Sequence, residues 1–194
     1  MLNKLSLKDK KRFDIFGDKI FINNEEKSLN EIQYPISSWS SLSYFISSLF
    51  LLETNYIVAN LATFSIAIIS FCWWANQNTF AQLFDLCLIT FLFSWPTLQN
   101  YNISQQYQFI YLILIIVSSI LKFNIIFRYK SLYTLVIVFS LYSLLINKMF
   151  ISILIFLISA LCKFSGSKYG TGLFHILSSF SIITISISFK NLQK

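Results

Sequence analysis

Polar and charged residues interrupt the chain repeatedly after residue 38 and leave apolar segments between them. Seven apolar segments follow one another, at 39–52, 56–74, 80–95, 107–121, 131–146, 149–162 and 171–189. A helix that crosses a membrane needs about 20 residues and rarely fewer than about 17, so the shorter segments would use their polar flanks to reach the interface. The pattern predicts an all-α membrane protein, a bundle of about seven transmembrane helices. The alternative is five spans, with 131–162 partly re-entrant.

Most of the acidic residues and many of the basic ones precede this region. Residues 1–38 contain seven of the 15 Lys and Arg and six of the eight Asp and Glu. We expect a charged N-terminal segment at 1–38 that is interfacial or binds a partner, a seven-helix transmembrane domain at 39–189, and a short C-terminal tail at 190–194. With the N-terminus inside, twelve basic residues fall on the inner side and three on the outer side, which predicts N-in and C-out.

The composition excludes several classes of protein. Hydrophobic residues make up 56% of the 194 residues and charged residues only 12%, whereas a soluble domain carries about 25% charged residues. Three cysteines are too few for a disulfide-stabilised secreted domain, and we expect them to be small apolar residues: Cys72, Cys87 and Cys162. No continuous basic face of the kind that binds nucleic acid is visible. The four tryptophans lie at segment ends, where an aromatic belt is expected: Trp39, Trp73, Trp74 and Trp95.

Three polar residues inside the apolar segments are candidates for a functional site. Asp85 is the only acid within an apolar segment, His175 is the only histidine, and Ser70 lies near the end of the second segment. In a seven-helix order, helix 2 ends where helices 3 and 7 begin, at one face of the membrane. Ionisable groups at membrane depth usually line an interior or a cavity. We therefore predict a hydrogen bond between Asp85 and His175, with a backbone carbonyl as the alternative partner of His175.

These residues also resemble the motifs of a known superfamily. The string Ser70-Phe71-Cys72-Trp73-Trp74, followed by Asp85, resembles the helix 2 to helix 3 signature of alkaline ceramidase-like seven-helix proteins. That superfamily includes the adiponectin-receptor-type membrane hydrolases. The string Gly170-Thr171-Gly172-Leu173-Phe174-His175 is similar to its last-helix motif, and Tyr34-Pro35-Ile36-Ser37-Ser38-Trp39 is similar to its segment before the first helix.

The resemblance implies a zinc site of which this chain retains only some residues. In the superfamily, three histidines bind zinc, while Asp and Ser hold the zinc-bound water. Here Trp74 and Thr171 occupy two of the ligand positions, and only His175 is retained. A catalytic zinc needs about three protein ligands. The resemblance therefore implies that Asp85, Ser70 and His175 are the remnant of a catalytic site, with His175 as the one remaining metal ligand.

The function implied is that of a ceramidase-like membrane protein without zinc-dependent hydrolysis, which binds lipid or acts as a structural component. No cofactor is expected. Zinc would be bound only if this interpretation of the site as degenerate is wrong. Partners would be membrane lipids or other membrane subunits, and not nucleic acid. Two alternatives stay open: an accessory subunit of a large complex, for example in the mitochondrial inner membrane, and an active lipid amide hydrolase with Asp85 as general base. The sequence is compatible with the mitochondrial inner membrane and with the endoplasmic reticulum.

Overall fold

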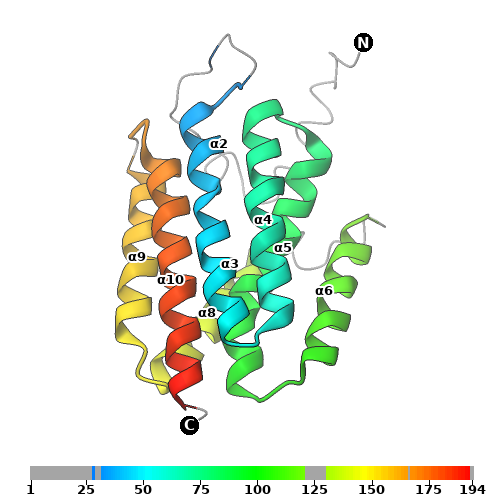
Figure 1. Ribbon diagram of the computed structural model, residues 1–194, viewed down its shortest axis with the longest axis vertical. Helices are drawn as coiled ribbons and strands as arrows, with labels where there is room; N and C mark the ends of the chain where they lie inside the picture. Colours follow the sequence, from blue (N-terminus) through cyan, green and yellow to red (C-terminus); the bar gives the residue numbers. More distant parts are fainter. Residues whose placement is uncertain (1–27, 29–31, 121–129, 166, 193–194) are drawn as a thin grey trace.

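The protein is a bundle of helices that run along one long axis (Figure 1). The computed structural model describes residues 28, 32–120, 130–165 and 167–192, and these residues form helices and no strand. In chain order the helices are α2 (Pro35–Ser41), α3 (Ser43–Glu53), α4 (Ile57–Asn76), α5 (Thr79–Asn100), α6 (Gln105–Ile120), α8 (Lys130–Ile146), α9 (Phe150–Phe164) and α10 (Gly170–Leu192). The predicted all-α fold is confirmed, and the seven apolar segments coincide with these helices, the first being shared by α2 and α3.

Three of the described helices are long and apolar enough to cross a membrane. They are α4, α5 from Phe80 onward, and α10. The apolar parts of α6, α8 and α9 are shorter, between 10 and 17 residues. This set is compatible with an integral membrane protein. The predicted N-terminal segment at 1–38 lies outside the described residues, except for residue 28 and residues 32–38. Its last residues belong to the bundle, because α2 begins at Pro35 and buries Ser37 and Ser38.

A tight turn places the end of α4 beside the start of α5. Helix α4 ends at Asn76 because Gln77 adopts a left-handed backbone conformation, with φ of 51°. The next residue, Asn78, begins α5, since its side-chain oxygen accepts hydrogen bonds from the backbone N–H groups of Phe80 and Ala81 at 2.8 and 3.5 Å. A side-chain cap of this kind satisfies amide groups that have no partner within the helix. The α4–α5 turn therefore brings the polar residues of the two helices to one end of the bundle.

Many hydroxyl groups inside the bundle donate to a carbonyl of their own helix. Thr63 donates to Ala59 at 2.7 Å, Thr90 to Leu86 at 2.7 Å, and Ser94 to Thr90 at 3.0 Å. This pattern satisfies a buried hydroxyl without a second helix. Other hydroxyls join two helices, because Ser47 of α3 and Ser179 of α10 bring their Oγ atoms to 2.6 Å.

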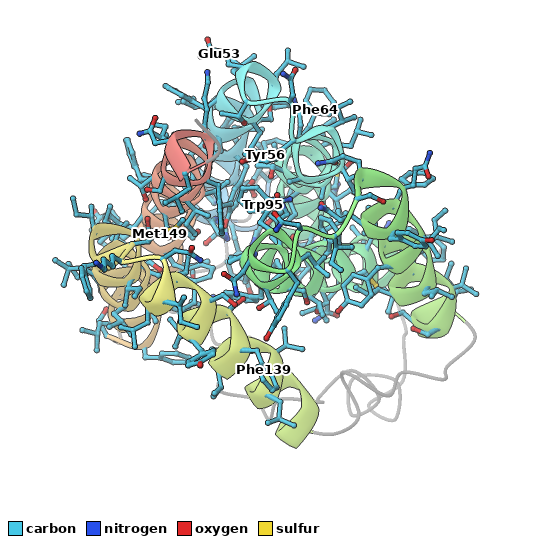
Figure 2. The ribbon with its side chains drawn as sticks, turned by 90° about the horizontal axis from the view of Figure 1, so that it is seen from below. Glu53, Tyr56, Phe64, Trp95, Phe139 and Met149 are labelled. Atoms are coloured by element: carbon cyan, nitrogen blue, oxygen red, sulfur yellow. The ribbon has the colours of Figure 1, made fainter. Side chains whose placement is uncertain are left out.

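The apolar core lies in the middle of the bundle, around Trp95 and Phe91. The Trp95 ring packs edge-on against Tyr56 at 5.3 Å and against Phe189 at 6.0 Å between ring centroids. Figure 2 shows Trp95 and Tyr56 at the centre and Phe139 at the outer edge of α8. The predicted aromatic belt is wrong for Trp73, Trp74 and Trp95, which are buried, and stays a prediction for Trp39, which is exposed. Trp95 is central because α5 continues through Pro96 to Asn100.

Candidate functional site

The residues selected from the sequence meet at the end of the bundle where α4 ends and α10 begins. Ser70 and Trp74 come from α4, Asp85 from α5, and Thr171 and His175 from α10, and all five are buried. The Trp74 and His175 rings lie 6.1 Å apart between centroids, and Ser70 lies beside the Asp85 carboxyl group. The end of α4 and the starts of α5 and α10 therefore lie together at one end of the bundle, and their place at one face of the membrane stays a prediction.

The His175 ring is held by α2 and not by Asp85. Its Nδ1 atom lies 3.0 Å from Oγ of Ser40 and 3.1 Å from the backbone oxygen of Ser37, both in α2. The predicted hydrogen bond between Asp85 and His175 is wrong, since the structure places none between these two described residues. The alternative partner, a backbone carbonyl, is correct. The physical reason is that α2 packs directly on α10 and offers its hydroxyl and carbonyl groups to the ring.

Gly172 makes this contact between α2 and α10 possible. A Cβ atom at Gly172 would lie 2.9 Å from Cγ2 of Ile36 and 3.4 Å from Oγ of Ser40. Real Cβ atoms do not approach other atoms so closely, so a side chain here would move α2 outward. Because Gly172 is three residues before His175, it lies on the same face of α10. The glycine therefore allows the helix approach that places Ser40 within hydrogen-bonding distance of the histidine.

Lys163, in the last turn of α9, belongs to the same site. Its ammonium group donates to Oγ1 of Thr171 at 2.9 Å and lies 5.0 Å from the centroid of the Trp74 ring. These are the two side chains that occupy the ligand positions implied by the resemblance. The apolar segment stops at residue 162, so the sequence pattern alone places Lys163 outside the helix. We call the six residues the polar cluster: Ser70, Trp74, Asp85, Lys163, Thr171 and His175.

Two polar atoms in the polar cluster are buried without a hydrogen bond. They are Oδ1 of Asp85 and the indole Nε1 of Trp74. Asp85 and Lys163 interact electrostatically, but no salt bridge within 4.0 Å joins these two described residues. An acceptor and a donor without partners are costly in a buried site. The polar cluster therefore retains hydrogen-bonding capacity that its own side chains do not use.

The donor set of the polar cluster does not fit zinc. An indole nitrogen carries a proton and offers no lone pair to a metal, and the Thr171 hydroxyl already accepts from Lys163. His175 is a single imidazole, and its Nδ1 is engaged by α2. Within the described ranges, no group of three or more His, Cys, Asp and Glu side chains could hold a metal ion. The ammonium of Lys163 would also repel a divalent cation at this place.

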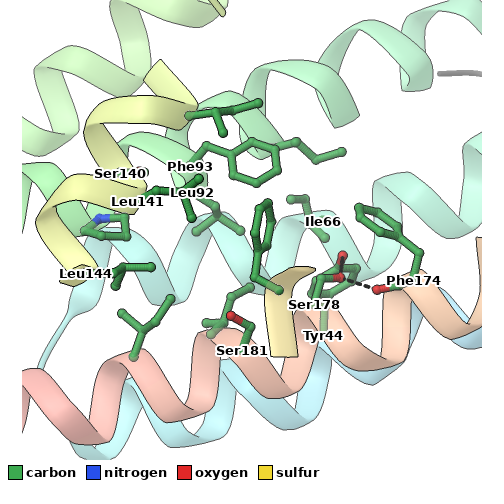
Figure 3. Close-up of a pocket in the computed structure, with 16 residues that line it drawn as sticks. Tyr44, Ile66, Leu92, Phe93, Ser140, Leu141, Leu144, Phe174, Ser178 and Ser181 are labelled. Carbon is green, nitrogen blue, oxygen red and sulfur yellow. Dashed lines mark hydrogen bonds between the residues drawn. The ribbon is translucent and has the colours of Figure 1, made fainter. Parts of the chain in front are cut away.

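An apolar pocket of about 70 Å³ borders the polar cluster (Figure 3). It is lined mainly by α5, α8 and α10, with Phe93 and Ile182 among its apolar walls. One end carries Tyr44 and Ser178, whose hydroxyl groups are 2.6 Å apart. The Tyr44 ring also lies 6.1 Å from the His175 ring, so Tyr44 is where the pocket borders the polar cluster. Ser140, on α8, adds a buried hydroxyl without a hydrogen bond.

Comparison with known proteins yields no relative: no protein family, no curated protein and no solved structure matches this chain.

Proposed function

We propose that the protein is an integral membrane protein of seven spans that binds a lipid, with part of an acyl chain in the pocket between α5, α8 and α10. The pocket supports this proposal because its lining is apolar along most of its length, with hydroxyl groups at Tyr44, Ser140 and Ser178. Sites for small amphiphiles usually combine an apolar wall with a few polar groups that orient the ligand.

The size of the pocket limits what it can accept. Its volume of about 70 Å³ corresponds to roughly five water-sized spheres. This space suits a short run of methylene groups and not a complete lipid. The rest of the molecule would lie along the apolar outer faces of the helices, which expose large side chains such as Leu145 and Ile158. The bound segment would thus be held more tightly than the surrounding lipid.

We further propose that the fold is related to that of the ceramidase-like proteins and that zinc-dependent hydrolysis has been lost. The convergence of Ser70, Asp85 and His175 at one end of the bundle supports the relationship. The presence of Trp74 and Thr171 at the other two ligand positions, both in contact with Lys163, supports the loss of the metal. In this proposal, Asp85 and His175 are structural residues of the polar cluster.

The lipid proposal can be tested with a phospholipid that carries a photoreactive diazirine in its acyl chain. The protein is reconstituted with this lipid and illuminated, and labelled peptides are mapped by mass spectrometry. We expect labelling at Phe93 and Ile182 to exceed labelling at Ile110, an exposed residue of α6. Ser140→Leu should fill the pocket and suppress this labelling without removing a hydrogen bond.

Ser119→Leu is the matched control. Ser119 is also a buried serine and lies beside the Cys87 thiol, but it does not line the pocket. Equal labelling of the native protein and Ser140→Leu would contradict the proposal. Hydrolysis of a fluorescent ceramide that is abolished by Asp85→Asn would instead favour the hydrolase alternative. Comigration with a large complex on native gels would favour the accessory-subunit alternative.

A further inference from the structure

We infer that the ammonium group of Lys163 is the resident cation of the polar cluster, and that the polar cluster is a binding site for primary ammonium groups which the chain fills with its own side chain. Two groups of different chemistry contact the ammonium, the Thr171 hydroxyl and the Trp74 ring, and the Asp85 carboxyl group interacts with it electrostatically without a salt bridge within 4.0 Å. This inference rests on the polar cluster alone and not on the lipid pocket.

The contacts of Lys163 match the chemistry of an alkylammonium ion. One N–H donates to Oγ1 of Thr171 at 2.9 Å, and the charge lies 5.0 Å from the centroid of the Trp74 ring. A cation within about 6 Å of an aromatic centroid is attracted by the ring face. An ammonium has three N–H groups, so further donors remain for a carboxylate or for a bridging water. The unpartnered Oδ1 of Asp85 is an acceptor in the same polar cluster.

The distribution of charge makes Asp85 the nearest candidate counter-charge for Lys163 among the described side chains. Asp85 and Glu53 are the only carboxylates among the described side chains. Glu53 is exposed at the end of α3, where Lys190 of α10 reaches its backbone oxygen. At the other end of the bundle, Asp85 is therefore the only carboxylate that the described chain offers to Lys163. A buried carboxylate without a counter-charge is costly, and the aliphatic stem of a lysine can lie along apolar surface while its ammonium reaches a polar partner.

Chemical rescue tests the inference directly. Lys163→Ala removes the three methylene groups and the ammonium beyond Cβ, which together correspond to n-propylammonium. We expect this variant to lose roughly 3–8 °C in Tm, and n-propylammonium chloride to restore part of the loss. Tetramethylammonium chloride, which has no N–H group, should restore less. In the double variant Lys163→Ala, Asp85→Asn, n-propylammonium should have no specific effect.

Lys168→Ala is the matched control. The Lys168 ammonium lies 5.0 Å from the Tyr169 ring centroid, the same distance as in the Lys163–Trp74 pair, but both residues are exposed. Removing it should leave Tm unchanged. A Lys163→Ala variant that melts like the native protein would overturn the inference. An equal rise in Tm with n-propylammonium in the presence and absence of the Asp85 carboxyl group would overturn it as well.

A measurement on the native chain covers the case in which Lys163→Ala does not fold. Acylation of lysines in the folded protein, followed by mass spectrometry, should modify Lys163 several-fold more slowly than Lys168. Asp85→Asn should raise the rate at Lys163 and leave the rate at Lys168 unchanged. Equal rates at the two lysines in the native protein would overturn the inference. Failure of the lipid-labelling experiment would leave these outcomes unaffected, because they depend on a different site.

Discussion

The Nδ1 atom of His175 lies 3.0 Å from Oγ of Ser40, and this contact joins α10 to α2. The same ring atom lies 3.1 Å from the Ser37 carbonyl oxygen, which can only accept a hydrogen bond. Ser40 can donate to either of these atoms, because it also lies 3.1 Å from the Ser37 oxygen. The three groups form one small network, so each should depend on the others.

Ser40→Ala should lower the free energy of unfolding by about 0.5–1.5 kcal/mol, the usual contribution of one hydrogen bond. The double variant Ser40→Ala, His175→Leu should lose less free energy of unfolding than the sum of the losses in the two single variants, because both substitutions disrupt the same network. Equilibrium unfolding in detergent measures all three values. Ser165→Ala is the control, since that exposed hydroxyl bonds only to neighbouring backbone groups. Additive losses for Ser40 and His175 would show that the contact contributes nothing.

Two glycine substitutions should differ in whether they can be rescued. A Cβ at Gly172 would meet a side-chain atom, Cγ2 of Ile36, whereas a Cβ at Gly170 would meet the backbone oxygen of Cys162 at 2.5 Å. Each substitution to alanine should cost about 1–3 kcal/mol, typical of overpacking. Ile36→Ala should recover part of the loss in Gly172→Ala but none in Gly170→Ala. Recovery of both variants, or of neither, would contradict this packing.

The two turns beside the polar cluster should be accessible from the same side of a membrane. Single cysteines replacing Asn76 and Lys168 should react with an impermeant thiol reagent added to that side. Both residues are exposed, and neither caps a helix through its side chain, as Asn78 does. A cysteine replacing Ser104, at the opposite end of the bundle, should react from the other side. Labelling of Asn76 and Lys168 positions from opposite sides would refute the seven-span topology.

The native protein should purify without stoichiometric zinc, and a chelator should leave the Tm of the protein unchanged. The reason is the donor set: Trp74 has no lone pair for a metal, and Thr171 accepts from Lys163. Elemental analysis of the purified chain measures the metal. One zinc per chain would contradict both the loss of the site and the assignment of Lys163 as its cation.

Rebuilding the metal site should require removal of the lysine. Trp74→His with Thr171→His would provide three imidazoles together with His175, two of them spaced i, i+4 on α10. The ammonium of Lys163 contacts both substituted positions and would oppose a divalent cation. We expect little zinc in this double variant and about one zinc per chain when Lys163→Ala is added. Equal zinc content in the two variants would show that Lys163 does not occupy the site.

The convergence of the polar residues could be predicted from the sequence, because it depends only on helix order. Ser70, Asp85 and His175 lie near the ends of segments that must share one face in an up-and-down bundle. The run of polar residues at Asn76–Thr79 also predicts the boundary between α4 and α5 correctly. These features depend on local chemistry and on the number of helices, both of which can be read along the chain.

The exact partners could not be predicted, because they depend on helix packing. Helix α9 extends to Phe164, beyond the apolar segment, and this extension brings Lys163 over α10. Pro96 would be expected to end a helix, but α5 passes through it, as transmembrane helices often do, and Trp95 is therefore central. Ser40 replaces Asp85 as the partner of His175 because Gly172 lets α2 approach α10.

The internally bonded hydroxyls bear on how such a chain enters a membrane during synthesis. Thr63, Thr90 and Ser94 each donate to a carbonyl of their own helix, so these hydroxyls are satisfied as soon as each helix has formed. The bond between Ser47 and Ser179 cannot form until α10 has been made. The hydroxyls of Thr63, Thr90 and Ser94 therefore need no partner from the C-terminal helix, whereas the contact of α3 with Ser179 is completed only after the ribosome has finished most of the chain.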